Sequence, residues 1–161
     1  MDKRDGSVLV AVDFSDDSQT ALDWAIDYAD RANAPLTIVH VVHDPAGAPG
    51  YYRREKEDLL LPLEEIAKDR FDEFLADVRQ KRPNSAALRN ASIVLVRGLP
   101  SNRILAVAEK NGAKHIVVGC QGRTGLPRLM VGSVAQRVVQ LSPVPVTVVK
   151  SKKSNSKERQ Q

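Results

Sequence analysis

One glycine-rich segment of the chain combines the residue types that hold phosphate groups. It spans residues 119–134 and includes Gly119, Gly122, Gly132 and Ser133. Glycines let backbone N–H groups approach an anion without interference from β carbons. The start of a following helix adds free N–H groups and a dipole that favours negative charge. These residue types therefore point to a site for a phosphate-bearing ligand.

The residue types alone leave this interpretation open. Neither Gly-x-x-x-x-Gly-Lys-Ser/Thr nor Gly-x-Gly-x-x-Gly occurs in the chain, so two common phosphate-binding motifs are absent. Arg123 and Arg128 are candidate cations within the segment. However, glycines often follow strands in α/β proteins, and Ser133 has the side chain of an ordinary helix N-cap.

Five short apolar runs alternate with segments of helical periodicity. The runs are Val8–Val12, Leu36–Val42, Ala91–Val96, His115–Gly119 and Pro145–Val149. Residues 15–32, 63–78, 100–110 and 133–141 have the spacing or end signals of helices. This alternation predicts an α/β fold, a three-layer α/β/α sandwich with a parallel sheet. Pro145 lacks an N–H donor, so the last strand should lie at an edge, or Pro145 should only begin it.

Two polar clusters follow predicted strands at positions suited to a ligand. Asp13-Phe-Ser follows the first strand, and the glycine segment begins where the fourth ends. Ligands in open α/β sheets bind beyond the carboxyl ends of strands, where the winding direction reverses. A carboxylate at such a point suits a ribose hydroxyl or a metal-bound water. The alternative is that Asp13 only closes a strand before a helix.

The spacing Gly119-x2-Gly122-x9-Gly132-Ser133 resembles the nucleotide-binding signature Gly-x2-Gly-x9-Gly-Ser/Thr of universal stress proteins. The resemblance extends from Val8 to Lys150. It includes Val-Ala-Val-Asp13-Phe-Ser, His40-Val41, Gly98-Leu-Pro100 and Val144-Pro145-Val146. Several spaced motifs in the correct order make this a specific resemblance.

The resemblance implies a five-stranded parallel sheet in the order 3-2-1-4-5, of the Rossmann-like, adenine nucleotide alpha hydrolase-like type. That order places Asp13 beside Gly119. In ATP-binding members, the residue matching Asp13 lies by the nucleoside, and the backbone of the residue matching Val41 contacts adenine. The glycines and Ser133 hold ribose and phosphates. The implied site residues are Ala11, Val12, Asp13, Val41, Gly98, Gly119, Gly122, Arg123, Gly132, Ser133 and Val134.

The resemblance implies ATP, or ADP or AMP, as the ligand, with Mg²⁺ as a companion ion that Asp13 contacts only through water. The expected function is a regulatory module of the stress response whose partner contacts are gated by nucleotide. No nucleophile, base and orienting group occur together, so we expect no fast enzyme. A slow ATPase or phosphotransferase is the alternative. A response-regulator receiver domain would need an aspartate where the chain has Arg97-Gly98.

The expected partners are a second copy of the chain and a protein that the sequence does not identify. The family commonly forms dimers through the fifth strand, and the apolar edge at residues 146–149 is a template for strand pairing. We therefore expect a homodimer.

The chain has 161 residues and a net charge of +4. We expect one universal stress protein domain at residues 1–150 and a basic tail without fixed structure at 151–161. From Lys150 onward there are five Lys or Arg against one Glu, whereas residues 1–149 hold 19 charges of each sign. The basicity therefore indicates no specific nucleic-acid surface on the domain. No apolar run is long enough to insert into a membrane, so a cytoplasmic location is expected.

Four further side chains carry simpler expectations. His40 lies within an apolar run and is expected to be buried with its hydrogen bonds satisfied. His43 and His115 are expected at the surface, and no spacing among the histidines suggests a metal site. Cys120 is the one cysteine, which we expect to be an exposed thiol that packs beside the ligand and is not a nucleophile. Residues 51–54, Tyr-Tyr-Arg-Arg, read either as a cover over the nucleotide or as a solvated loop.

Overall fold

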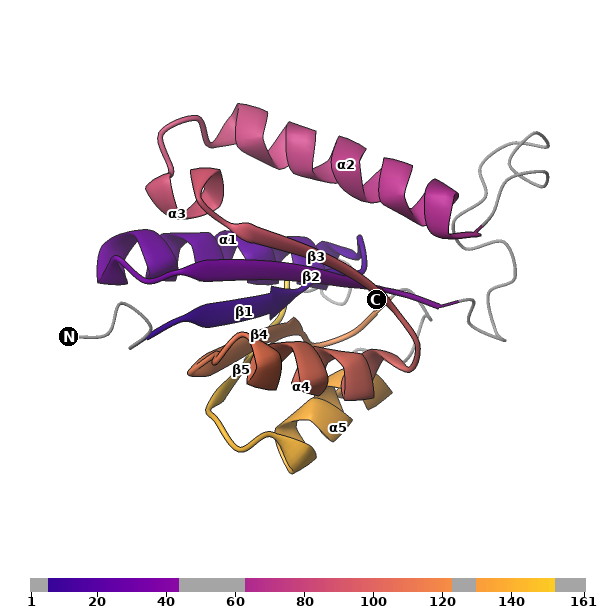
Figure 1. Cartoon of the computed structure of the whole chain (residues 1–161). Helices are drawn as coiled ribbons and strands as arrows, with labels where there is room; N and C mark the ends of the chain where they lie inside the picture. The colour runs from indigo at the N-terminus through magenta and orange to yellow at the C-terminus, as the bar shows by residue number, and fades with distance from the viewer. Residues whose placement is uncertain (1–5, 44–62, 123–129, 153–161) are drawn as a thin grey trace, which may run out of the picture.

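The computed structural model describes residues 6–43, 63–122 and 130–152. They form a five-stranded, wholly parallel sheet in the order β3-β2-β1-β4-β5, with helices on both faces (Figure 1). The strands are β1 (Val8–Ala11), β2 (Leu36–Val42), β3 (Ser92–Arg97), β4 (His115–Gly119) and β5 (Val146–Val149). The predicted fold class and strand order are thus confirmed, and strand boundaries differ from the prediction by one residue at most.

The helices divide between the two faces of the sheet. They are α1 (Asp16–Ala32), α2 (Leu63–Lys81), α3 (Ala86–Arg89), α4 (Pro100–Lys110) and α5 (Ser133–Leu141). The first three cover one face, and α4 and α5 cover the other (Figure 1). The short α3 was not predicted, because four residues are too few to show a helical period. Ser85 caps it, and the buried Leu88 anchors it to the core.

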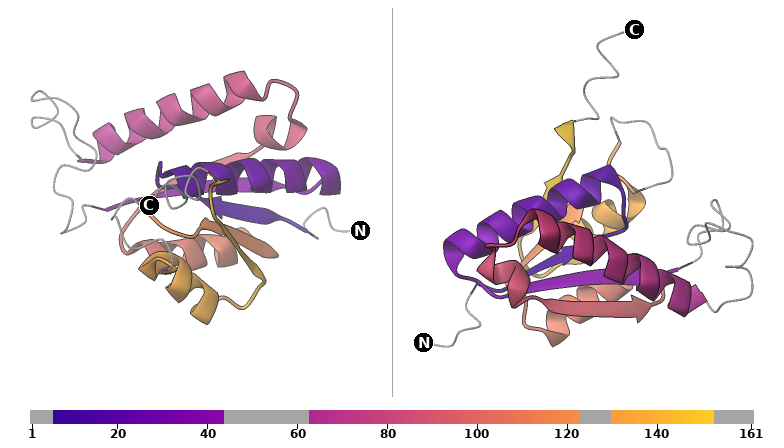
Figure 2. Two further views of the ribbon diagram at one scale, coloured as in Figure 1. Left: turned by 180° about the vertical axis from the view of Figure 1, so that it is seen from behind. Right: turned by 90° about the horizontal axis from the view of Figure 1, so that it is seen from above.

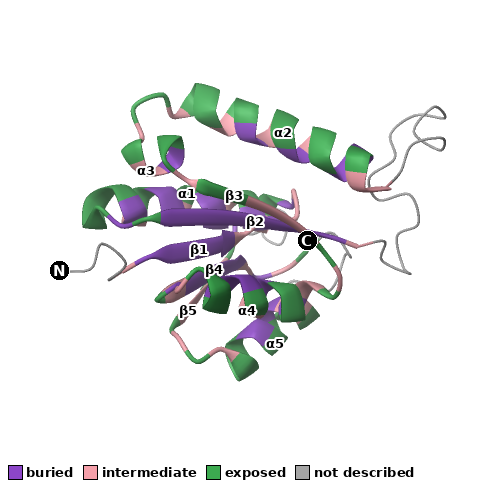
Figure 3. Ribbon diagram, viewed as in Figure 1, coloured by how far each residue is buried: buried purple, intermediate pink, exposed green. Residues whose placement is uncertain are grey.

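The core consists of two aliphatic layers, one on each side of the sheet. Val8 and Val10 of β1 face α1 and α2, whereas Leu9 faces α4 and α5. Successive side chains of a strand point to opposite faces, so one strand contributes to both layers. Every residue of β2 is buried, as expected for an inner strand of a doubly covered parallel sheet (Figure 3).

The first edge of the sheet is β3, and the other is β5, which follows a proline. β3 forms one edge and β5 the other, as the views from behind and from above show (Figure 2). Pro145 directly precedes β5, and its carbonyl accepts a hydrogen bond from Ile116 N–H at 3.0 Å. The prediction of a last strand at the edge is confirmed, because β5 is the outermost strand beside β4. An edge position suits a strand that begins with proline, since proline has no N–H to donate to a neighbouring strand.

The order of the strands creates a crevice at one end of the sheet. β1 pairs with β2 on one side and β4 on the other, so the chain winds in opposite directions from β1. The connections that follow β1 and β4 therefore diverge to opposite faces, which leaves room between them. Within the described parts of the chain, we find no helix with the length and apolar character needed to cross a bilayer.

Candidate functional site

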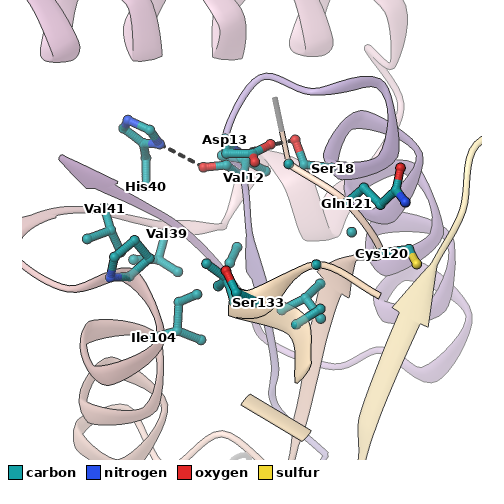
Figure 4. Close-up of a pocket in the computed structure, with 18 of the residues that line it drawn as sticks. Val12, Asp13, Ser18, Val39, His40, Val41, Ile104, Cys120, Gln121 and Ser133 are labelled. Atoms are coloured by element: carbon teal, nitrogen blue, oxygen red, sulfur yellow. Dashed lines mark hydrogen bonds between the residues drawn. The ribbon is translucent and has the colours of Figure 1, made fainter. Parts of the chain in front are cut away.

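A cavity of about 320 Å³ lies at the carboxyl ends of β1, β2 and β4 (Figure 4). This is the size of a small ligand pocket. Its lining includes nine of the eleven residues predicted from the sequence. They are Ala11, Val12, Asp13, Val41, Gly119, Gly122, Gly132, Ser133 and Val134. The fold therefore brings the cluster after β1 and the cluster after β4 to one cavity, as the switch-point prediction required.

The other two predicted residues have different outcomes. Arg123 lies outside the described residues, as do Arg128, residues 51–54 and the tail from residue 153. Gly98 is described, but it is not among the residues that line the cavity. It has a φ of +139°, and its N–H donates to the Val42 carbonyl at 3.2 Å. This glycine turns the chain from β3 into α4, whose first residue, Pro100, does line the cavity.

One side of the cavity is apolar. Val39 and Val41 of β2 and Ile104 of α4 lie together there (Figure 4). The sequence prediction included Val41 but missed the other two. Val39 precedes Val41 by two residues, so strand alternation puts both on one face, and this signal was available in the sequence. Ile104 reaches the cavity only because α4 packs across the same face, which tertiary structure decides.

The turn after β1 is tightly held. The Oδ1 atom of Asp13 accepts hydrogen bonds from the Ser15 hydroxyl and from Ser15 N–H, the latter at 3.0 Å. The Asp13 N–H donates to Ser18 Oγ at 3.2 Å, and Ser15 Oγ accepts from Ser18 N–H to cap α1. Asp13 thus closes the strand before a helix and also lines the cavity, so its two alternative interpretations are compatible.

Phe14 adopts a left-handed conformation in this turn, with a φ of +66°. This conformation is costly for a bulky residue and persists only where the surroundings enforce it. The Phe14 ring packs against His40, with ring centroids 4.5 Å apart, and edge-on against Phe74 at 5.4 Å. The aromatic contacts hold the backbone of the turn, and therefore the neighbouring Asp13, in one position.

His40 supports the same turn from β2. Its Nδ1 lies 2.7 Å from the Val12 carbonyl oxygen, and its side chain is buried at 1% exposure. Burial lowers the pKa of His40 from 6.5 to about 4, so the ring is neutral at pH 7. A carbonyl oxygen can only accept, so Nδ1 carries the proton. The prediction of a buried, satisfied histidine is confirmed.

The three glycines of the motif allow close approaches between segments. A β carbon on Gly119 would lie 2.8 Å from Ser18 N and 2.9 Å from the Asp17 carbonyl carbon. One on Gly132 would lie 3.1 Å from the Cys120 carbonyl oxygen, which accepts from Gly132 N–H at 2.7 Å. One on Gly122 would lie 2.8 Å from Asp13 Oδ2. These glycines bring α1, the loop after β4 and the start of α5 together around the cavity.

The helix starts at this end of the sheet differ in their affinity for an anion. α1 is capped by Ser15 and carries two acidic residues in its first turn, which opposes a second negative charge. α5 begins after Gly132, with no side-chain cap and no acidic residue in its first turn. Ser133 is therefore the first residue of the helix, not its N-cap. Of α1 and α5, only α5 therefore offers N–H groups suited to an anion at its start.

Three side chains are more buried than was expected from the sequence. His115 is not at the surface: it is half-buried, its ring packs edge-on against Trp24 and Tyr28, and its Nε2 lies 2.7 Å from Thr147 Oγ1. His43 is also half-buried and lines the cavity. Cys120 is not an exposed thiol, because its exposure is 1%, although it does line the cavity as a packing residue.

Comparisons with known proteins agree with the fold and with the family that the sequence resembles. Residues 6–150 match the model of the universal stress protein family. Universal stress protein YxiE of Bacillus subtilis is 33% identical over 147 residues, which cover 89% of this chain and 97% of YxiE. The structure of universal stress protein UspA from Lactobacillus plantarum is similar, with a TM-score of 0.68 and 28% identity, and covers 91% of this chain and 98% of its own.

A further similar structure carries a ligand. It is a universal stress protein in complex with cAMP, 26% identical to this chain, with a TM-score of 0.59. The match covers 89% of this chain and 95% of that one. The family match spans most of the sequence, and the order of the strands is the one that the sequence motif implied. The chain therefore belongs to the universal stress protein family.

Proposed function

We propose that the protein binds an adenine nucleotide, with ATP as the main ligand, and acts as a regulatory module in the stress response. The observation that carries this proposal is the start of α5, which opens without a cap or an acidic residue onto the polar end of the cavity. The opposite end of the cavity is apolar. A nucleoside phosphate has the same division, with a planar base at one end and an anion at the other.

The proposed pose follows from this division. The base lies against Val39, Val41 and Ile104, and the backbone of Val41 contacts the adenine edge. The ribose lies near Asp13, between the two ends. The phosphates accept hydrogen bonds from the N–H groups that follow Gly132 and from the Ser133 hydroxyl. The universal stress protein that was solved in complex with cAMP supports an adenine ligand for this fold.

Mg²⁺ is proposed to arrive with the phosphates and not to occupy a protein site of its own. Among the described residues, no three His, Cys, Asp or Glu side chains gather to hold a metal ion. Asp13 Oδ1 is already engaged by Ser15. The Oδ2 atom would contact a water on the ion. Binding with and without Mg²⁺ tests this, since a site formed only by phosphates takes up no Mg²⁺ without nucleotide.

The cavity favours binding over rapid chemistry. Asp13 is the carboxylate among the described lining residues, and it also anchors the turn before α1. His40 is neutral, and its Nδ1 proton is directed to the Val12 carbonyl and not into the cavity. Steady-state release of phosphate tests this point. Turnover well above about one per minute, which is still slow for an enzyme, would favour the alternative ATPase.

The first experiment identifies the nucleotide that the purified protein carries. Chromatography and mass spectrometry of the released ligand should recover ATP, ADP or AMP, and calorimetry should give the order of affinity. Gly132→Val and Ser133→Ala should weaken or abolish binding. A folded sample that neither carries nor binds an adenine nucleotide would refute the proposal.

A charge variant makes this test sharper. Ser133→Asp adds an acidic residue to the first turn of α5, which should stabilise the helix by about 0.3–1 kcal/mol. The same charge should abolish phosphate binding, because it occupies the anion position. Gln140→Asp adds the same charge near the other end of this helix and serves as the control. Binding that survives in Ser133→Asp would place the phosphates elsewhere.

We also propose a homodimer through β5 and a nucleotide-dependent contact with another protein. β5 is an edge strand, and Val148 on it is 36% exposed. Val139 and Leu141 of α5 add exposed apolar surface. We propose that residues 1–150 form the folding unit and residues 151–161 a basic tail, with the correction that Ser151 itself is buried and hydrogen-bonded to Asp17.

A further inference from the structure

One carboxylate connects two segments of the chain that leave the sheet beside the cavity. Asp17 lies in the first turn of α1, and its Oδ2 accepts a hydrogen bond from Gln121 N–H at 3.1 Å. Its Oδ1 accepts from Ser151 N–H at 2.9 Å. These partners follow β4 and β5, and they lie 104 and 134 residues from Asp17 in the chain. A single side chain therefore holds the ends of both strands.

The contact with Gln121 bears directly on the cavity. Gln121 stands between Cys120, whose carbonyl binds Gly132 N–H, and Gly122, which lies against Asp13. The segment from Cys120 to Gly122 thus contacts the start of α5 and the turn after β1. A shift of the Gln121 backbone would move this segment relative to both of them.

The contact with Ser151 bears on the basic tail. Ser151 is 5% exposed although β5 ends two residues earlier, so the domain holds the chain beyond its last strand. The Cys120 N–H also donates to the Val149 carbonyl at 2.7 Å, which ties the ends of β4 and β5 together. Five of the 24 Lys and Arg residues lie at or after Lys150, so Asp17 binds the chain where this basic stretch begins.

We propose that Asp17 is a positioning residue that couples the nucleotide loop after β4 to the start of the C-terminal tail. The inference rests on the proposed nucleotide binding. Phosphates bound at the start of α5 fix Gly132, whose N–H donates to the Cys120 carbonyl, and this contact holds the neighbouring Gln121. The Gln121 N–H in turn fixes the Asp17 carboxylate, which holds Ser151. Coupling between two sites is reciprocal, so retention of Ser151 also favours the loop geometry that binds nucleotide. The tail is then the segment through which occupancy of the cavity reaches a partner.

A simple electrostatic role for Asp17 makes the opposite prediction. The Asp17 carboxylate contacts Gln121, which lines the cavity, so removal of its negative charge should strengthen binding of an anionic nucleotide if charge alone matters. Removal of its two hydrogen bonds should weaken binding if position matters. Asp16 provides the matched control, because it is an exposed acidic residue in the same first turn. Asp16→Asn and Asp17→Asn remove the same charge from the same helix end.

The experiment measures ATP affinity of the two variants and of the wild type by calorimetry. In Asp17→Asn, the side chain keeps one oxygen acceptor and gains an NH₂ donor, so either Gln121 N–H or Ser151 N–H loses its acceptor. We expect ATP to bind roughly fivefold more weakly, or weaker still. Asp16→Asn should bind as tightly as wild type or more tightly. Equal or tighter binding by Asp17→Asn would overturn the inference. Absence of binding in the wild type would instead overturn the proposed function.

A second measurement compares the wild type with and without nucleotide before it turns to the variant. Amide hydrogen exchange in wild type should slow at both Gln121 and Ser151 when saturating ATP is added, and trypsin should cleave more slowly after Lys152. In Asp17→Asn, the effect at Ser151 and the protection from trypsin should disappear, even at ATP concentrations that saturate the variant. Protection of Gln121 without any change at Ser151 in wild type would show that the tail is not coupled, and would overturn the inference.

Discussion

A β carbon on Gly122 would lie 2.8 Å from Oδ2 of Asp13, so the loop after β4 and the turn after β1 meet at a point where a larger residue would displace the Asp13 carboxylate. These residues are 109 positions apart and follow neighbouring strands of the sheet. The contact gives a structural reason for a glycine here without reference to any ligand. It also means that the loop after β4 and the Asp13 carboxylate hold each other in position.

Gly122→Ala should destabilise the protein by about 1–2 kcal/mol, the cost of moderate overpacking. The atom that it meets is the end of a short side chain, so Asp13 must turn away or the loop must shift. In an Asp13→Ala background the same substitution should cost much less. Urea denaturation of the four proteins in this double-mutant cycle gives the coupling energy. Additive effects would mean that the two residues are not in contact in solution.

Gly119→Ala should be more harmful than Gly132→Ala. The added carbon at position 119 meets backbone atoms of α1 at 2.8 and 2.9 Å, which cannot move unless the helix shifts from the sheet. We expect a loss of about 1–3 kcal/mol in the free energy of unfolding. At position 132 the nearest atom is 3.1 Å away, and the φ of −62° suits alanine. Thermal unfolding of both variants should preserve this order, and the reverse order would contradict the proposed reason for Gly119.

Acid should destabilise the fold through His40. Its pKa is lowered to about 4 by burial, whereas an unfolded histidine has a pKa near 6.5. Between these values the unfolded state binds the proton and the folded state does not. Stability is therefore complete above pH 6.5 and falls as the pH drops toward 4, by up to about 3 kcal/mol.

The control for this prediction is His40→Gln, which removes the titrating ring. The difference in unfolding free energy between wild type and variant should shrink as the pH falls from 7 to 4. His115→Gln provides a comparison, because burial also lowers the pKa of His115 but that ring is only half-buried. A pH profile of His40→Gln that runs parallel to the wild type would show that other groups cause the loss.

The two sheet edges offer a matched test of dimer formation. Val148 on β5 and Ile93 on β3 are 36% and 37% exposed, and both belong to edge strands. A lysine on an edge strand opposes pairing with another edge. Val148→Lys should therefore convert the proposed dimer to a monomer, while Ile93→Lys should leave it intact. Light scattering during size-exclusion chromatography measures the mass. A wild-type monomer at micromolar concentration, or a dimer lost only in Ile93→Lys, would contradict the proposed interface.

Much of the fold follows from local sequence signals. The five apolar runs are short, rich in β-branched residues and separated by segments of helical periodicity. A strand that is buried on both faces shows such a continuous apolar run, so these runs predict the strands of a doubly covered sheet. The helix boundaries follow from Ser15, Pro100 and the segment that begins at Arg82. α3 was missed because a helix of one turn has no period. The partial burial of His115 was missed because its contacts with Trp24 and Thr147 come from other elements.

The sequence by itself determined the alternation of strands and helices, the glycine motif and the family. These depend on residue types and spacings within single segments. Only the tertiary structure showed that Gly119 and Gly122 fit against Asp17 and Asp13, that Ile104 completes the apolar wall, and that Asp17 holds both Gln121 and Ser151. Each of these relationships joins residues distant in the chain. Their distances depend on how α1 and α4 pack on the sheet, which no local pattern encodes.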